Sequence, residues 1–214
     1  MPRVSHCCAP SGYDELFGEK QGRRDARRYR RRGLDNAARW IVETARDHGV
    51  QGVTVLEPGG GVGAIQIELL KAGAAHSTIV ELSTGYDEAA RELAREAGVE
   101  ARIERRLGDF AANGAGEADV VVLHRVVCCY PDYERLLGAA ATRARRLLVF
   151  THPPRNAASR AFFGTLNLWM RLRGKDFRAF AHPPEAMVAA VRRHGLEPVA
   201  SRRGLWYGAA FERR

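Results

Sequence analysis

The stretch Val53-Thr54-Val55-Leu56-Glu57-Pro58-Gly59-Gly60-Gly61-Val62-Gly63 joins a short apolar run to a cluster of glycines. The apolar run, residues 53–57, predicts a buried strand, and the glycines that close it predict a tight loop. Because glycine has no Cβ, this loop can turn sharply and let a ligand approach its backbone closely. The pattern of residues 64–71 predicts a helix next, and its N-terminal amides favour a carboxylate or a phosphate.

Strand and helix patterns alternate along the rest of the chain, which predicts a parallel sheet with right-handed crossovers. The last two expected strands are too close in sequence for a helical crossover, so they should form an antiparallel hairpin. The expected strands are residues 53–57, 78–82, 101–107, 119–124, 146–151, 198–201 and 205–211. The expected helices after the glycine loop are residues 64–71, 87–96, 133–141, 157–172 and 185–194.

The N-terminal part of the chain divides near residue 34. Residues 1–24 show no periodicity and are expected to form a partly ordered arm. An apolar stripe at helical spacing begins at Leu34, with Asp35 placed to cap a helix and Gly49 placed to end it. We therefore expect a basic, partly helical arm over residues 1–34 and one α/β domain over residues 35–214.

The composition is that of a globular protein, with 214 residues and a formal net charge of +9. No apolar stretch approaches the roughly 20 residues that span a bilayer, and the start of the chain lacks the apolar core of a secretory signal. We expect a cytoplasmic protein with no membrane partner. Seven of the ten residues 23–32 are arginine. They fit a nucleic-acid contact, a clamp for an anionic substrate, or a solvated helix face.

The glycine loop follows an E-x-G-x-G-x-G pattern, which differs from the G-x-G-x-x-G of dinucleotide sites. A carboxylate at Glu57 would repel a pyrophosphate and would suit a ligand that carries an ammonium and a sulfonium. Other polar and aromatic residues follow consecutive strands, where ligands of open α/β sheets bind. Glu81 could accept hydrogen bonds from ribose hydroxyls, Asp109 could accept one from an adenine amino group, and Phe110 offers a flat apolar contact.

With these residues in order, the chain resembles the class I methyltransferases that depend on S-adenosylmethionine (SAM), over about residues 35–214. The resemblance implies a Rossmann-like sheet of order 3-2-1-4-5-7-6 with strand seven antiparallel, and SAM as the cofactor. It places the methionine part on the glycine loop, the ribose on Glu81, and the adenine on Asp109 and Phe110. The full set of expected cofactor residues is Glu57, Gly59, Gly60, Gly61, Gly63, Glu81, Leu82, Asp109, Phe110 and His124.

A looser resemblance, to small-molecule O-methyltransferases of the Mg-protoporphyrin type, lies in the helical arm and in the segment from His124 to Tyr130-Pro131. The SAM methyl group is already electrophilic, so a base is needed only where the acceptor must lose a proton. His124, His152 and Tyr130 are the candidates for a base or for a group that orients the acceptor. His152 also has a plain structural interpretation, because His-Pro-Pro simply ends a strand.

Several alternatives remain open from the residues alone. The cysteines, in the adjacent pairs Cys7-Cys8 and Cys128-Cys129, fit buried apolar positions, and less well a nucleophile or a site for a soft metal or metalloid. No metal site is predicted. The apolar face of residues 153–183 fits a core or a homodimer contact better than a pocket wall. The leading hypothesis is methyl transfer to a small, perhaps anionic molecule. The alternatives are an RNA or DNA methyltransferase and a non-catalytic SAM-binding module.

Overall fold

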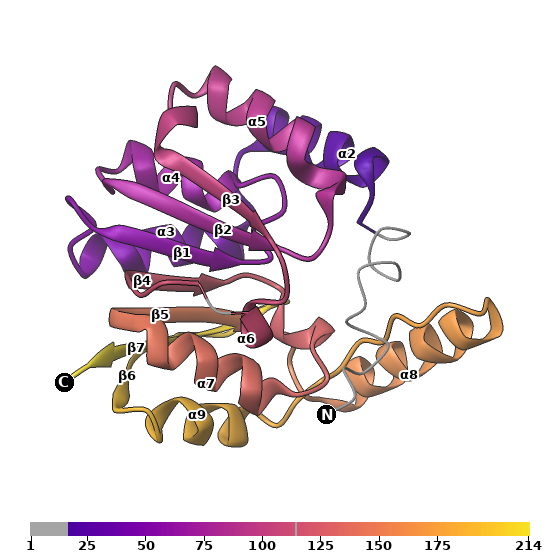
Figure 1. The fold of residues 1–214 in the computed structure, drawn as a ribbon. Helices are drawn as coiled ribbons and strands as arrows, with labels where there is room; N and C mark the ends of the chain where they lie inside the picture. Colours follow the sequence, from indigo (N-terminus) through magenta and orange to yellow (C-terminus); the bar gives the residue numbers. More distant parts are fainter. Residues whose placement is uncertain (1–16, 114) are drawn as a thin grey trace.

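The computed structural model describes residues 17–113 and 115–214, which form a seven-stranded sheet of order β3-β2-β1-β4-β5-β7-β6 (Figure 1). Strands β3, β2, β1, β4 and β5 run parallel, and β7 is antiparallel to both of its neighbours. This is the order that the sequence predicted. The strands are β1 (Thr54–Pro58), β2 (His76–Glu81), β3 (Ile103–Leu107), β4 (Ala118–Leu123), β5 (Ala144–His152), β6 (Leu196–Arg202) and β7 (Tyr207–Arg213).

Helices cover both faces of the sheet, and each face has its own apolar core. The helices are α2 (Glu19–Arg32), α3 (Asn36–Asp47), α4 (Ala64–Lys71), α5 (Asp87–Glu96), α6 (Phe110–Asn113), α7 (Tyr133–Arg143), α8 (Ala157–Leu172) and α9 (Pro184–Arg192). Buried residues of α3, α4 and α5 form one cluster, and those of α7 and α9 form another on the opposite face. The described residues also form three 3-10 turns: η2 (Thr84–Tyr86), η3 (Glu100–Arg102) and η4 (Val127–Cys129).

The predicted bounds of α4, α5 and α8 coincide with the observed ones, and most strand ends differ by one or two residues. β5 starts two residues earlier than predicted, at Ala144, which pairs with Ala118 of β4, and it thus includes the exposed Arg145. The hairpin strand β6 likewise extends from the predicted residue 198 back to Leu196. Backbone pairing with a neighbouring strand thus extends each of these strands beyond its apolar run.

The predicted N-terminal helical arm is confirmed by α2, which begins at Glu19 and so includes part of the stretch, residues 1–24, where the sequence shows no periodicity. Only Gly22 and Ala26 of α2 are buried, so the helix shows no apolar stripe in the sequence. It is held by polar contacts to the body instead: Arg30 pairs with Glu92 and Glu96 of α5 at 3.1 and 2.7 Å, and the Tyr29 hydroxyl donates to Glu68. Figure 1 shows α2 lying along α5.

The predicted start of α3 is confirmed. Asp35 is the residue before the first helical turn, and its Oδ1 accepts hydrogen bonds from the amides of Ala37 and Ala38 at 2.9 and 3.0 Å. Gly49, with φ +81°, follows the end of the helix in the left-handed conformation that glycine favours. This cap holds the Asp35 side chain at a fixed place, which matters for the site described below.

α8 differs from the other long helices because it projects from the body of the fold (Figure 1). Met170 is the one buried residue of its sixteen. A search of residues 17–113 and 115–214 finds no helix with the length and apolar character needed to cross a membrane.

Candidate cofactor site

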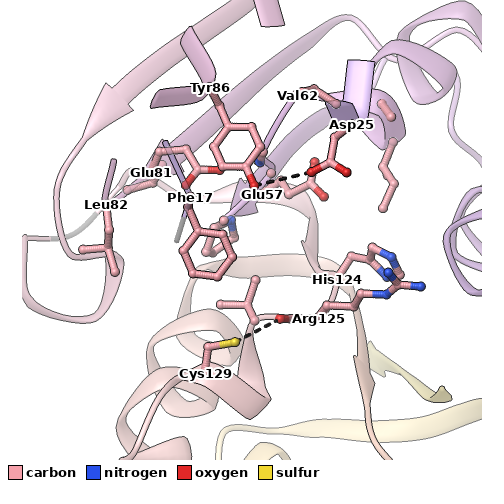
Figure 2. Close-up of a pocket in the computed structure, with 18 of the residues that line it drawn as sticks. Phe17, Asp25, Glu57, Val62, Glu81, Leu82, Tyr86, His124, Arg125 and Cys129 are labelled. Atoms are coloured by element: carbon pink, nitrogen blue, oxygen red, sulfur yellow. Dashed lines mark hydrogen bonds between the residues drawn. The ribbon is translucent and has the colours of Figure 1, made fainter. Parts of the chain in front are cut away.

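A cavity of about 370 Å³ opens at the carboxyl ends of β1, β2 and β4, and residues of α2 and of the α2–α3 connection also line it (Figure 2). Its position is the one at which open α/β sheets bind ligands. All of the predicted cofactor residues except Gly63 line it: Glu57, Gly59, Gly60, Gly61, Glu81, Leu82, Asp109, Phe110 and His124. The sequence therefore predicted most of one continuous wall.

The glycine loop is shaped by close contacts that a side chain would not tolerate. A Cβ on Gly59 would lie 2.6 Å from Cγ2 of Val126, and one on Gly60 would lie 3.0 Å from both Glu57 Oε2 and Ile79 Cγ2. Gly63 has φ +76° and immediately precedes α4. Its position is thus that of the residue that starts the helix, beneath the loop, which explains why it does not line the cavity.

Glu57 lies beneath the loop at the end of β1 and is only 2% exposed. Its Oε2 has no hydrogen-bond partner among the residues that the structure describes. Burial is the main reason that the pKa of the Glu57 carboxyl is raised to about 8; the Gln66 side chain opposes this rise, and the nearby Glu81 carboxyl adds to it. The sequence suggested a charged carboxylate at Glu57, but with this pKa the side chain is mainly protonated at pH 7. A cation bound next to it would favour the ionised form.

Glu81 and Arg105 fix the other side of the loop. Oε1 of Glu81 accepts a short hydrogen bond from the amide of Gly61, and burial raises the pKa of this carboxyl. Arg105 of β3 donates to the Gly61 carbonyl at 3.1 Å and to Asp87 at 3.0 Å. Its guanidinium thus ties β3 and α5 to the glycine loop. Sequence analysis missed Arg105, because the alternating pattern of β3 predicted only an edge strand.

Asp109, Phe110 and Tyr130 form the far end of the cavity. The Tyr130 hydroxyl donates to Asp109 Oδ2 at 3.1 Å, and Asp109 Oδ1 accepts from the amide of Ala111 at 2.9 Å. The Phe110 ring is buried, with the guanidinium carbon of Arg143 5.1 Å from its centre. Tyr130, which was predicted as a catalytic candidate, thus acts on the orientation of Asp109.

His124 faces the cavity from the end of β4, beside the capping residue of α3. Its Nδ1 lies 3.1 Å from Thr151 Oγ1, and its Nε2 lies 3.6 Å from Asp35 Oδ2. Burial lowers the pKa of His124, so the neutral imidazole predominates at pH 7. Burial also raises the pKa of Asp35, but His124, the Ala38 amide and Arg125 outweigh it and hold that pKa well below its usual range.

Arg125 completes this group. Its Nη2 is 2.8 Å from Asp35 Oδ2, its guanidinium lies 5.0 Å from the centre of the Trp206 ring, and its backbone has φ +60°. Its Nε is buried and makes no hydrogen bond within the described residues. Asp35 and Arg125 were missed as site residues, because a helix cap and a loop arginine carry no motif.

The structure does not bring His152 to the cavity. Its Nδ1 lies 2.9 Å from the Pro153 carbonyl oxygen, and its ring packs against Phe150 and Tyr207. Burial lowers its pKa, so the ring is mainly neutral. His152 therefore occupies the structural position that the His-Pro-Pro sequence already suggested for it.

Residues of α2 contribute the part of the cavity that sequence analysis did not predict. Asp25, Arg28 and the preceding Phe17 line it, and Asp25 lies 3.5 Å from the hydroxyl of Tyr86 (Figure 2). The one sequence signal was the arginine run, to which Arg28 belongs. Its other members have different roles: Arg30 pairs with α5, Arg23 pairs with Glu19 of its own helix, and Arg24, Arg27, Arg31 and Arg32 are exposed.

The second cysteine pair lies at the cavity wall. Cys129 lines the cavity, its sulfur is 3.5 Å from that of Cys128, and both sulfurs lie within 3.7 Å of the Arg125 carbonyl oxygen. Within the part of the chain that the structure describes, neither cysteine forms a disulfide bond. The alternative that His6, Cys7 and Cys8 meet this pair falls outside the described residues.

Comparison with protein families matches residues 56–146 to a methyltransferase domain. The chain carries a SAM-dependent methyltransferase domain with the class I fold. The match runs from Leu56 within β1 to Arg146 near the start of β5, and it includes the glycine loop, Glu81, Asp109 and His124. SAM is the cofactor of this domain. A sequence search finds no match among curated proteins.

Solved structures share the fold of this methyltransferase. Magnesium protoporphyrin IX methyltransferase from Synechocystis PCC 6803, with bound SAM, is 18% identical at a TM-score of 0.65, over 95% of this chain and 90% of that one. An O-methyltransferase family protein from Burkholderia thailandensis is 22% identical at a TM-score of 0.65, over 82% of this chain and 56% of that one. Mitomycin 7-O-methyltransferase is 24% identical at a TM-score of 0.60, over 83% of this chain and 54% of that one. At these identities the likeness concerns the fold.

Proposed function

We propose that this methyltransferase transfers the methyl group of SAM to a small molecule that carries an anionic or strongly polar group. The observation that carries the proposal is the cavity itself. It joins the glycine loop and two carboxyl groups on one side to His124, Asp35 and two guanidinium groups on the other. Because residues of α2 line it as well as the strand ends, a small ligand bound there would be contacted from more than one side.

The cofactor half of the proposal rests on the residues beneath the loop. Glu57 has an unpartnered buried oxygen, which the ammonium of the methionine part would satisfy, directly or through water. The glycines leave room for the methionine backbone. Glu81 ends β2 with a carboxyl group able to accept hydrogen bonds from two ribose hydroxyls, beside the apolar Leu82. Asp109, fixed by Tyr130, and the Phe110 ring would hold the adenine.

His124 is proposed as the group that accepts the acceptor's proton. In the tautomer whose Nδ1 donates to Thr151, the Nε2 lone pair is free. The distance of 3.6 Å to Asp35 is too long for a strong hydrogen bond, but it is close enough for the carboxylate to stabilise an imidazolium. The lowered pKa of His124 supplies the neutral form at pH 7. The methyl group then moves from sulfur to the acceptor atom, with donor and nucleophile held in line.

Arg28 and Arg125 support a polar or anionic acceptor. Arg28 pairs with Asp25 at 3.2 Å, and Arg125 pairs with Asp35 at 2.8 Å. Because a guanidinium has five N–H donors, one carboxylate does not use all of them. The buried Nε of Arg125 has no hydrogen-bond partner within the described residues. A carboxylate or phosphate of the acceptor would satisfy such donors.

The test uses two substitutions that share the same backbone strain. Gly61 (φ +55°) lines the cavity, whereas Gly98 (φ +68°) is exposed and has no atom within 4 Å of an added Cβ. Gly61→Arg should abolish SAM binding in calorimetry and transfer of a labelled methyl group to a cell extract. Gly98→Arg should keep both, because its side chain points into open space.

The acceptor class is identified in the same assay by separating the extract after reaction. We expect the label in a small-molecule fraction that binds an anion exchanger. Label in RNA or DNA would assign the alternative, a nucleic-acid methyltransferase. SAM binding without any transfer would assign a non-catalytic SAM-binding module.

A further inference from the structure

α8 exposes an apolar surface that the methyltransferase activity does not use. Among the described residues, seven large apolar side chains are exposed, and four of them lie on this one helix. They are Phe162 (64%), Leu168 (58%), Trp169 (45%) and Leu172 (78%). Of the other three, Leu107 ends β3, and Val199 and Leu205 lie in the β6–β7 hairpin. The concentration on α8 is the feature to explain.

The helix carries apolar side chains both where it attaches to the body and on its exposed surface. Phe163, Leu166 and Met170 follow helical spacing and pack against the cluster around Phe177, which attaches the helix to the body. Phe162, Trp169 and Leu172 are spaced by seven and three residues, so they share another face, with Leu168 beside them. The Phe162 ring meets the Phe163 ring of the attached face edge to face, and Leu168, Trp169 and Leu172 lie further round the helix.

Arginines flank the exposed face on both sides. At 100° per residue, Arg160 and Arg171 fall next to Leu168, and Arg173 falls beyond Phe162 and Trp169. The guanidinium carbon of Arg173 lies 4.8 Å from the centre of the Trp169 ring. Between residues 153 and 175 the sequence holds five basic residues and no Asp or Glu: Arg155, Arg160, Arg171, Arg173 and Lys175.

We propose that α8 binds to the surface of an anionic lipid bilayer, with Phe162, Leu168, Trp169 and Leu172 in the outer acyl region and the flanking arginines on lipid phosphates. An apolar stripe rich in Trp, Phe and Leu, bordered by Lys and Arg, is the composition of a helix that lies in a membrane interface. Charge complementarity selects an anionic surface, because the segment carries positive charge alone.

This proposal revises the expectation of no membrane partner. That expectation rested on the absence of a stretch long enough to span a bilayer. A helix that lies in the interface needs no such stretch, because its polar face stays in the headgroup region.

The helix also connects the proposed membrane contact to the cavity. Phe17 and Cys129 line the cavity, and both pack against the cluster formed by the inner face of α8. The Phe17 and Phe177 rings meet edge to face with their centres 5.9 Å apart. A bilayer bound to α8 would therefore lie on the side of the molecule where this cavity wall is formed.

Vesicle sedimentation of the full chain tests the proposal, with phosphatidylcholine vesicles with and without phosphatidylglycerol. We expect binding to the anionic vesicles that weakens with added salt. The double variant Leu168→Asp/Leu172→Asp should weaken it by roughly a hundredfold. Its matched control is Val199→Asp/Leu205→Asp, which replaces two exposed apolar residues elsewhere and should bind as the native chain does.

A second pair of double variants tests how much the arginines contribute to vesicle binding. Arg171→Gln/Arg173→Gln should weaken binding, and Arg31→Gln/Arg32→Gln on α2, with the same loss of charge, should weaken it less. Thermal unfolding followed by circular dichroism checks that each variant is folded. Neither this measurement nor vesicle sedimentation requires SAM or methyltransferase activity, so the membrane proposal can fail while the proposed function holds.

Three results would overturn the proposal. They are no binding to either vesicle, equal binding by the α8 double variant and its control, or a dimer in light scattering that Leu168→Asp/Leu172→Asp dissociates. The last result would assign the face to a second copy of the chain.

Discussion

At the scale of single residues, the buried Glu57 makes stability depend on pH. Its pKa is raised to about 8 in the folded state, from an ordinary value of about 4.5, so the folded protein holds a proton that the unfolded chain has lost. The stability is therefore fully present below pH 4.5 and is lost as the pH rises towards 8. Glu57→Gln should remove this dependence, which reaches about 1.4 kcal/mol per pH unit.

Urea unfolding at pH 5.5, 6.5 and 7.5 measures the effect. The native chain should lose stability over this range relative to Glu57→Gln, and parallel curves for the two proteins would refute the assignment. Glu185→Gln serves as the control, because Glu185 is an exposed residue at the start of α9.

The sequence predicted site residues where a residue follows a strand in order. Glu57, Glu81, Asp109 and His124 all reach the cavity, because the carboxyl ends of parallel strands meet at one edge of the sheet. Asp35 and Arg105 could not be predicted in this way. Each reaches the site through a contact between elements that lie far apart in the chain, and a contact of that kind leaves no local pattern.

At the scale of elements, α2 depends on a close approach of two backbones. A Cβ on Gly22 would lie 2.9 Å from the Gly85 carbonyl oxygen and 3.3 Å from Cα of Tyr86. Gly22→Ala should therefore displace α2 from η2 and lower the free energy of unfolding by about 1–3 kcal/mol. Denaturant titration measures it, and SAM affinity should fall as well, since Tyr86 faces Gly61.

Gly164→Ala in α8 is the matched change, because it is also glycine to alanine within a helix, with no atom within 4 Å of the new Cβ. It should raise stability by about 0.5–1 kcal/mol, through the better helix propensity of alanine. If the free energy of unfolding changed in the same direction in Gly22→Ala and Gly164→Ala, the close approach of the two backbones could not be the cause of the loss in Gly22→Ala.

α2 also shows what periodicity leaves out. The sequence analysis relied on apolar stripes, and this helix has none, since ion pairs and Tyr29 hold it. The signal that was present is the run of good helix formers, Glu, Lys, Gln, Arg and Ala, over residues 19–32. Propensity describes the helix, but the partner against which it packs appears only in three dimensions.

At the scale of the whole molecule, the sheet separates two apolar cores, and the strand order could be predicted because alternating patterns and the closing hairpin leave few topologies. In the second core, the Phe150 and Phe211 rings stack with their centres 5.7 Å apart. Phe211→Ala should destabilise the protein by about 3–5 kcal/mol and lower the melting temperature by roughly 10 °C.

Calorimetric scanning measures this change. Val199→Ala on β6, whose side chain is 44% exposed, should remain within about 0.5 kcal/mol of the native protein. A comparable loss in both variants would show that the hairpin, and not the stacked pair, determines the stability of this core.

The antiparallel β7 imposes an order on assembly during protein synthesis. β6 leaves the ribosome before β7, yet it pairs with β7 alone, and β7 lies between it and β5. Until β7 has emerged, the nascent chain therefore presents β5 as an open edge with unpaired amides and carbonyls, while β6 has no strand to join. The sheet thus grows one strand at a time from β1 to β5 but closes in a single late step, and that interval is when the chain most needs a chaperone.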